Sequence, residues 1–526
     1  MNNLSVKENK TLGNVFYCLW TKKCVNGMSG FVCNYVTDVE GNFEYFCRFV
    51  HLSSALSFDD KREALVLEAG AYFVFGGDAV DKGPGDIRVC RLLVALKKKH
   101  PDRVFLIVGN RDLNKLRYAA ELSTSDLERS IDSIPPPHWD PKAPTLRDYL
   151  EGVARDSNVT DVRNLNTRVH RLKYILKHTL GCPQTFEFRR EELAVLGNTA
   201  VENISDENVV DSCVYEICDP NGSLWQYIDN GSVGAIIGNT LFVHGAINRS
   251  CMKYVPQHIK FENSDKPQLP FKMVESVHEW VDLLNQYLRD GFDDYLKRPH
   301  WNEDRTSRGG ESLMALQNRS ASWGRTVVVN SYCDGGNVTS DYARAVMENE
   351  DRQRQILVNP LAFEGLNSDP RDEEVAKWLL ENKIQRLIVG HKPCGDCPAV
   401  LSSRYTGVEV VCGDTSFSDT SAKDNRGLAA SSTEIHGKNS TDNHVELKGI
   451  LRDGQPYNCA FPRLHDGDKV DASVGDPLLG NELKSKWWVK VRIQMGNEEV
   501  GYQLSKGQRR TVEYKRVLKR EIHAFL

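Results

Sequence analysis

The sequence lacks the features that mark membrane and secreted proteins. No stretch of its 526 residues reaches the roughly 18 consecutive apolar residues of a membrane-spanning helix. The N-terminal MNNLSVKENKTLGN is polar and has no apolar h-region, so we expect no secretory signal. A strong charge imbalance is missing too, because a net charge of −5 indicates no global preference for nucleic acid or a membrane surface. We find no internal repeat.

The composition is that of a globular protein with a large core, at 40% hydrophobic and 26% charged residues. The 14 cysteines are scattered, and several lie inside apolar runs, such as Cys33, Cys90 and Cys412. This pattern is typical of reduced, packed thiols and predicts a cytoplasmic protein. Cys394 and Cys397 form a lone Cys-x-x-Cys, which we interpret as ordinary loop thiols because no second pair accompanies it.

Six short apolar runs each end in a residue type that binds metal ions. These residues are Asp38 with Glu40, then Asp78, Asn110, His244, His391 and Asp414. In an open α/β sheet, ligands collect at the carboxyl ends of the strands, because the strands deliver the residues that follow them to one edge. Asp, Asn and His at one edge make a mixed oxygen and nitrogen site for two divalent cations. The sequence therefore predicts a two-metal site for phosphate-ester hydrolysis.

The motifs around these residues occur in a set order: Asp-x-Glu-Gly, Gly-Asp-x-Val-Asp-Lys-Gly, Gly-Asn-Arg-Asp, Val-His-Gly and Gly-His. Together they resemble the calcineurin-like metallophosphoesterase superfamily, and most nearly its branch of Ser/Thr protein phosphatases. The resemblance is tight over residues 31–117, continues in patches near 241–249 and 386–416, and does not extend beyond about residue 420. It implies an α/β fold, a four-layer α/β/β/α sandwich with two mixed sheets. It also implies that a hydroxide bridging two divalent metals attacks a phosphomonoester.

The resemblance also implies a ligand set. Asp38 and Asp78 would hold the first metal, with Asp78 bridging to the second, and Asn110, His244 and His391 would complete the second site. Glu40 stands where the family has the His of Asp-x-His. It can still bind metal, and its oxygen donor favours manganese, iron(II) or magnesium over zinc. Asp414 would add an oxygen to the first metal, near the place where many relatives have a second late His.

Arg111 is the larger departure, because it replaces the His that protonates the leaving group in the family's Gly-Asn-His. A guanidinium cannot donate that proton, but it can neutralise charge on the phosphoryl group or on the leaving oxygen. We therefore expect a preference for acidic leaving groups, with Asp81 and Asp112 as other candidate proton donors. Lys82 stands where the family usually has Arg, and with Asn110 and Arg111 it forms the expected phosphate-binding set.

Two other interpretations stay open. Glu40 and Arg111 could pair with each other in a decayed site, which would make the chain a catalytically inactive homologue with a binding or scaffold role. Alternatively, the C-terminal segment could carry the main function. Between residues 484 and 520, eleven Lys or Arg stand against three Glu, together with Trp and Tyr residues. This segment could dock an acidic protein, RNA or an anionic surface. The simpler interpretation is that its basic residues form the solvent-exposed face of a strand.

The predicted organisation has a core with two insertions and a β-rich end. The insertions read as helices and favour an enclosed site for a small molecule or nucleotide, although a phosphoprotein substrate stays open. A Ser/Thr/Asn/Gly-rich stretch before the β-rich end predicts a linker or long loop. The segments are an N-terminal extension at 1–30, the core at 31–417, insertions at about 114–240 and 250–385, the linker at 418–443 and the basic β-rich segment at 444–526.

Within these segments the pattern predicts two further details. Residues 320–337 read as a hairpin in the second insertion. The run WVKVRI alternates strictly, which predicts a strand with Val489, Val491 and Ile493 on one face and with Lys490 and Arg492 on the other.

Overall fold

The computed structural model describes most of the chain outside the N-terminus and part of the second insertion. The described residues are 30–134, 143–157, 159–245, 247, 252–256, 271–303, 308–310, 313, 373–391, 393–402, 407–415, 418–419, 429–464, 470–471, 474–484, 487–495, 499–508 and 511–525. The hairpin expected at 320–337 and almost all of the N-terminal extension lie outside them. Within the described ranges, no helix is long and apolar enough to cross a membrane.

Two mixed sheets form the centre of the molecule. In the larger sheet, β1, β4, β5 and β6 are parallel, while β14, β15 and β16 extend it in antiparallel fashion beyond β1. Its strands in spatial order are β16 (Pro456–Ala460), β15 (Asn443–Ile450), β14 (Ala430–Gly437), β1 (Phe31–Val36), β4 (Tyr72–Phe75), β5 (Val104–Ile107) and β6 (Gly231–Ser232).

The smaller sheet has three parallel strands between two antiparallel edges. Strands β8, β11 and β13 run parallel, and β7 and β12 pair with them in antiparallel fashion. Its strands in spatial order are β12 (Ala399–Ser402), β13 (Glu409–Cys412), β11 (Arg386–Val389), β8 (Thr240–Val243) and β7 (Gly234–Ile237). Short two-stranded pairs lie elsewhere: β2 (Leu56–Phe58) with β3 (Leu65–Leu67), β9 (Tyr254–Pro256) with β10 (Phe271–Met273), and β17 (Arg463–Leu464) with β18 (Val470–Asp471).

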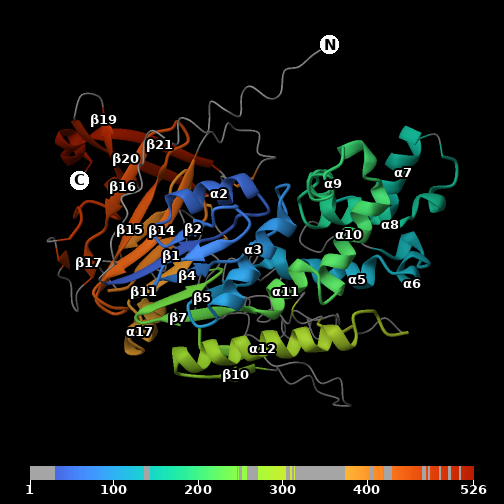
Figure 1. Ribbon diagram of the computed structural model, residues 1–526, viewed down its shortest axis with the longest axis horizontal. Helices are drawn as coiled ribbons and strands as arrows, with labels where there is room; N and C mark the ends of the chain where they lie inside the picture. The colour runs from blue at the N-terminus through green and yellow to red at the C-terminus, as the bar shows by residue number, and fades with distance from the viewer. Residues whose placement is uncertain are drawn as a thin grey trace, which may run out of the picture.

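The two sheets pack face to face, with helices on both outer faces. Tyr35 of β1 and Phe242 of β8 meet between the sheets, with ring centroids 5.9 Å apart. Helices α2 (Phe43–Leu52) and α3 (Asp86–Lys99) cover the larger sheet, where Phe49 packs on Phe73. Helices α12 (Val277–Lys297) and α17 (Glu373–Glu381) cover the smaller sheet (Figure 1). The predicted four-layer α/β/β/α sandwich is confirmed.

Helices also fill most of residues 110–229, a range that covers most of the first expected insertion at about 114–240. They project to one side of the sandwich as a helical lobe, here residues 117–218 (Figure 1). The lobe has a small apolar core of its own around Leu146, Leu150 and Tyr174. The helices are α4 (Asn110–Leu113), α5 (Arg117–Glu121), α6 (Thr124–Leu127), α7 (Leu146–Ser157), α8 (Arg168–Tyr174), α9 (Thr185–Leu196), α10 (Asp206–Cys218) and α11 (Ser223–Asp229).

The expected linker at 418–443 needs correction, because residues 430–437 form β14 in the larger sheet. Their composition reads as a loop, yet Ser432 and Glu434 are fully buried. The amide of Asn34 on β1 donates to both side chains, at 3.1 Å and 2.9 Å, so the polar groups are satisfied inside the sheet. Strands β15 and β16 follow in the same sheet. The core therefore extends past residue 417.

The last strands, β19 (Trp488–Met495), β20 (Glu499–Gln508) and β21 (Thr511–Leu518), form a separate antiparallel sheet. Val489, Val491 and Ile493 are buried as predicted. Lys490 is the exception, because it is 3% exposed and its ammonium donates to the carbonyl of Cys394 at 2.9 Å. A register shift between Val489 and Val491 breaks the strict alternation on which the prediction depended.

Candidate active site

The parallel strands deliver the predicted residues to one edge of the sandwich. Asp38, Asp78 and Asn110 follow β1, β4 and β5, while His244, His391 and Asp414 follow β8, β11 and β13. Asp38, Glu40, Asp78 and His391 all have φ between 49° and 64°. This left-handed region costs a residue other than glycine on the order of 1–2 kcal/mol. Such strain persists where the surrounding structure imposes it, and it gathers at functional sites.

Glycines before these residues allow the close approach. A Cβ on Gly109 would lie 2.1 Å from Oδ1 of Asp78, and a Cβ on Gly390 would lie 2.3 Å from Oδ2 of Asp38. No side chain fits at either position, which explains why Asn110 and His391 each follow a glycine.

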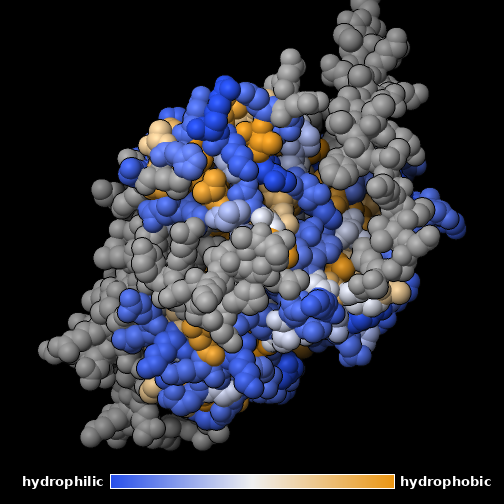
Figure 2. All heavy atoms as spheres, turned by 90° about the vertical axis from the view of Figure 1, so that its left-hand side faces the viewer, coloured by the Kyte–Doolittle hydropathy of each residue, from blue (hydrophilic) through white to orange (hydrophobic). Residues whose placement is uncertain are grey.

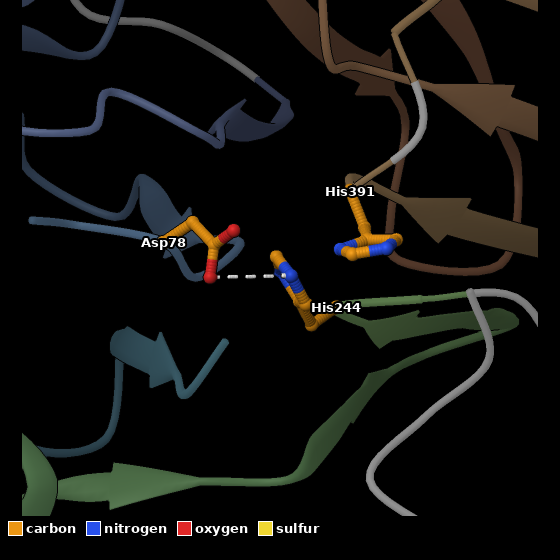
Figure 3. Close-up of side chains that lie close together, drawn as sticks. All are labelled: Asp78, His244 and His391. Atoms are coloured by element: carbon orange, nitrogen blue, oxygen red, sulfur yellow. Dashed lines mark ion pairs between the residues drawn. The ribbon is translucent and has the colours of Figure 1, made fainter. Parts of the chain in front are cut away.

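Three of the predicted ligands converge as a group that could hold a metal ion. The ligand atoms of Asp78, His244 and His391 all lie within 4.8 Å of one another, and no other His, Cys, Asp or Glu side chains in the described part of the chain form such a group of three or more. Figure 3 shows the two imidazoles beside the carboxylate, with 3.4 Å between Nε2 of His244 and Oδ1 of Asp78. Oδ1 of Asn110 lies 3.1 Å from the same Nε2.

This donor set fits a divalent transition metal. One carboxylate, two imidazoles and one amide oxygen suit manganese, iron or zinc. Nδ1 of His244 lies 2.9 Å from the carbonyl oxygen of Gly76. A carbonyl at that distance fixes the tautomer that leaves Nε2 as the ligand atom, which is how metal-binding imidazoles are oriented in proteins.

The residues expected around the first metal are arranged differently. Oδ2 of Asp38 accepts hydrogen bonds from the Thr37 hydroxyl at 2.6 Å and from the backbone N–H of His391 at 2.9 Å. Oε1 of Glu40 lies 2.7 Å from Nε of Arg111 and 3.0 Å from Nζ of Lys82. The structure thus places Glu40 in ion pairs, outside the converging group.

Arg111 contacts three carboxylates at once. Besides Glu40, its guanidinium pairs with Asp81 and lies 3.6 Å from Oδ2 of Asp78. The arginine side chain is 17% exposed, and Lys115 also pairs with Asp81 at 3.1 Å. The Glu40–Arg111 pair is the contact that the inactive-homologue interpretation expects.

Asp112 and Asp414 both accept hydrogen bonds from backbone N–H groups. The Asp112 carboxylate accepts the backbone N–H groups of Asp78, Ala79 and Gly109 at 3.0, 2.8 and 2.8 Å. It therefore holds the Asp78 and Asn110 loops together. Asp414 is buried, and its carbonyl accepts the N–H of Cys394 at 2.9 Å. Its carboxylate is not part of the group of three among the described residues.

The pKa values of the site residues are set by burial and by neighbouring charges, which act in opposite directions on Asp78 and His244. Burial raises the pKa of Asp38 to about 7. Burial also acts on Asp78, but His244 and Arg111 outweigh it and hold the pKa of that carboxyl well below its usual range. The pKa of His244 reaches about 10 despite burial, because Asp78 and Asp38 stabilise the imidazolium. The carboxylates thus make this edge strongly attractive to positive charge.

Several residues at this edge were not predicted from the sequence. The Ser418 hydroxyl donates to the carbonyl of Asp38 at 2.6 Å, and Asp419 lies 3.4 Å from Nζ of Lys82. From the helical lobe, Thr185 donates to the backbone carbonyl of Asp81 and lies 3.2 Å from its Oδ1. No sequence motif marks these three residues, because each meets the site only through tertiary packing.

The family model described as calcineurin-like phosphoesterase matches residues 35–395. Among solved structures, a cold-active protein-tyrosine phosphatase of a psychrophilic Shewanella species is 12% identical, with 82% of this chain and 80% of that chain covered and a TM-score of 0.34. A protein serine/threonine phosphatase from Saccharomyces cerevisiae, with similarity to human phosphatase PP5, is also 12% identical, with 85% and 84% covered and a TM-score of 0.29.

A search of the curated proteins finds no match. The family model spans well over half of the chain, and the matched residues include Asp78, Asn110, His244 and His391. The chain therefore belongs to the calcineurin-like phosphoesterase family and is a hydrolase of phosphoric esters.

Proposed function

We propose that the protein hydrolyses a phosphomonoester in a metal-dependent reaction at the edge formed by Asp78, Asn110, His244 and His391. The observation that carries this proposal is the convergence of Asp78, His244 and His391 within 4.8 Å, because unrelated structural roles give no reason for these groups to meet. Manganese and iron are the metals we favour, given one carboxylate and an amide oxygen beside two imidazoles. A bound divalent ion supplies Lewis acidity toward the phosphoryl oxygens and makes a bound water acidic near neutral pH.

The chain's own residues bind and orient the substrate. Arg111 and Lys82 present two cations beside the converging group, 2.7 Å and 3.0 Å from the shared Glu40 oxygen. A phosphate dianion approaching this edge meets both, and the planar guanidinium can contact two of its oxygens. Asn110 contributes an amide that can donate to a further oxygen.

Asp81, one of the two candidate proton donors for the leaving group, is poorly suited to that role. Asp81 pairs with both Arg111 and Lys115; although burial would raise its pKa, these two charges lower it. The carboxylate is then ionised at neutral pH and has no proton to give. We therefore infer that the substrate class has a leaving oxygen stable as an anion, such as an aryl phosphate or a phosphoanhydride.

The experiment is hydrolysis of p-nitrophenyl phosphate by protein stripped with chelator and then supplied with Mn²⁺. We expect turnover only after the metal is added, and loss of turnover in His244→Asn. A matched control is Arg171→His in the helical lobe. It removes the ion pair between Arg171 and Asp126, whose charged atoms lie 2.7 Å apart and whose side chains are both 3% exposed. Neither residue belongs to the converging group. This variant should keep the metal-dependent activity.

The second candidate is a scaffold or binding role without turnover. It is favoured by one observation, the Glu40–Arg111 pair at 2.7 Å in place of a ligand and a proton donor. If the protein binds Mn²⁺ yet hydrolyses no ester over a range of leaving groups, the scaffold role replaces the enzymatic proposal for this site.

We do not extend the proposal to RNA or an acidic protein at the C-terminal strands. The face that holds these strands is largely hydrophilic with scattered apolar side chains (Figure 2). Two basic groups of the C-terminal segment already have partners, since Arg516 pairs with Asp453 at 2.7 Å and Arg520 with Glu499 at 2.9 Å. The cytoplasmic location stays a prediction.

A further inference from the structure

We propose that the guanidinium of Arg111 takes the place of the first metal ion, so that the site binds one divalent ion instead of two. The inference rests on the proposed function, since it concerns the same site. It departs from the two-metal centre that the family resemblance implies, and it assigns Arg111 a structural charge in addition to its contact with phosphate.

The contacts of Arg111 carry the argument. Nε lies 2.7 Å from Oε1 of Glu40 and 3.6 Å from Oδ2 of Asp78. Glu40 and Asp78 are two of the carboxylates that the resemblance assigns to the first metal, Asp78 as the bridge. A cation already lies between them. A divalent ion at the same place would have to displace the guanidinium or sit against it, and the two would repel each other.

Glu40 and Asp38, two donors expected at the first position, have further partners. Lys82 reaches the same Glu40 oxygen at 3.0 Å, and the Ser418 hydroxyl lies 3.4 Å from the other oxygen. Oδ2 of Asp38 holds the Thr37 hydroxyl and the N–H of His391. An ion entering here would need to break the two ion pairs of the buried Glu40 carboxylate, and such desolvated pairs are costly to break.

The position of Arg111 is fixed from the far side by Asp81. This carboxylate is fully buried and pairs with Arg111 and Lys115, and Thr185 of α9 donates to its backbone carbonyl. The helical lobe thereby holds the guanidinium in place. By contrast, the second position brings the ligand atoms of Asp78, His244 and His391 within 4.8 Å of one another. At the first position, side-chain cations already balance the charge of the Glu40 carboxylate, whereas at the second position the Asp78 carboxylate faces two imidazoles that can bind metal.

The test measures metal content and not turnover alone. Purified full-length protein is stripped, loaded with excess Mn²⁺, desalted and analysed by elemental mass spectrometry and by electron paramagnetic resonance. We expect about one Mn²⁺ per chain, with the spectrum of an isolated ion and not of an exchange-coupled pair. His244→Asn should lose this ion, whereas Glu40→Gln should retain it.

The double variant Glu40→His/Arg111→His tests the replacement directly. It removes both members of the pair together, which avoids leaving one buried charge alone, and it restores the two His that the family has at these positions. We expect its Mn²⁺ content to rise to about twice that of the wild type, with a coupled spectrum. Arg171→His, which removes a buried and paired arginine in the helical lobe, should leave the content unchanged.

The outcomes separate this inference from the proposed function. Two coupled ions in the wild type overturn the replacement by Arg111 and leave metal-dependent hydrolysis standing. One ion that is lost in Glu40→Gln and kept in His244→Asn also overturns it, because the ion then occupies the first position. No Mn²⁺ bound at all overturns both. If the double variant fails to fold, the wild-type content and the two single variants still decide the question.

Discussion

The molecule holds two buried clusters of charge that invite comparison. We call one the metal-edge cluster, formed by Glu40, Asp78, Asp81, Arg111 and Lys115. The other, the β14 cluster, consists of Glu434 with the partners Asn34, Ser54, His436 and Lys448. In both, buried carboxylates contact cations at short distances, 2.7 Å for Glu40 to Arg111 and 2.7 Å for Glu434 to Lys448. Buried charge alone therefore does not mark a functional site.

The clusters differ in their backbone. Glu434 and Lys448 lie in regular antiparallel strands, and the Glu434 carboxylate also accepts from the Ser54 N–H and hydroxyl at 2.9 and 2.7 Å. It ties the end of α2 to the larger sheet. In the metal-edge cluster, Glu40 and Asp78 have φ of 49° and 55° and follow the ends of parallel strands. Strained backbone at the converging strand ends separates the site from the structural cluster.

The largest difference is expected from Asp78→Asn. This change removes the carboxylate of the converging group, and we expect kcat/KM for p-nitrophenyl phosphate to fall by about 10⁴-fold, or roughly 5 kcal/mol. Glu434→Gln serves as the control, and its kcat/KM should stay within about 3-fold of wild type at a temperature where both are folded. Equal losses in the two variants would erase the functional distinction between the clusters.

A second comparison concerns the leaving group. Because Arg111 stays protonated, we expect kcat/KM for aryl phosphates to exceed that for serine phosphate by about 10³-fold, or roughly 4 kcal/mol. The measurement is kcat/KM over esters of graded leaving-group pKa, for wild type and Arg111→His. The dependence should be steep in wild type and flatter in the variant. A flat wild-type series means that another group supplies the proton, and Asp81 would be examined first.

Glu434→Gln should affect stability. Burial would raise the pKa of Glu434, but His436 and Lys448 lower it from 4.5 to about 2. The stability from this depressed pKa is fully present above about pH 4.5 and is lost as the pH falls toward 2, and it amounts to about 3 kcal/mol. Denaturant unfolding at pH 7 should show that loss in the variant. The two proteins should converge as the pH drops below 4.5, and a difference that persists unchanged at pH 3 would refute the assignment.

The smallest effect tests backbone strain away from both clusters. Lys383 has φ 63° after α17, where its N–H donates to the Leu380 carbonyl at 2.8 Å and the Ile384 N–H donates to that of Leu379 at 2.9 Å. This is a helix end that favours glycine. We expect Lys383→Gly to raise the free energy of unfolding by about 1 kcal/mol with activity unchanged.

The matching change at the site is Asp38→Gly. It should relieve similar backbone strain but lose activity, and retained activity would show that Asp38 is dispensable.

The sequence predicted the residues at one sheet edge because their placement depends on local order, whereas the sandwich was implied by the family resemblance. Short apolar runs indicate strands, and the residue that ends each run marks the carboxyl end of its strand, as at Asp78, Asn110, His244 and His391. The family motifs indicate the order of these strands along the chain. Three-dimensional partners are harder to read. Lys490 looked solvated, yet it is buried because a register shift turns it toward Cys394.

Polar composition misled in a similar way at β14. Ser432 and Glu434 resemble loop residues in the sequence, but the Asn34 side chain hydrogen-bonds to both of them inside the sheet. Asn34 and Ser432 are 398 residues apart in the sequence. Thr185 and Asp419 gave no signal, since their role at the edge exists only once the lobe and the 418–419 turn have packed. The Glu40–Arg111 pair was foreseen as an alternative, but the sequence could not decide between a ligand and an ion pair.

The pairing of β1 with β14 has a consequence for how the chain folds. β1 (Phe31–Val36) pairs with β4 on one side and with β14 on the other. The pairing with β14 cannot form until residues 430–437 have been synthesised and have left the ribosome. Until then, the nascent larger sheet has an open edge of unpaired N–H and C=O groups, of the kind that recruits other chains. Contacts of such long sequence separation slow folding. We expect translation arrested before residue 430 to yield an aggregation-prone, chaperone-dependent chain, and release of the final hundred residues to close that edge.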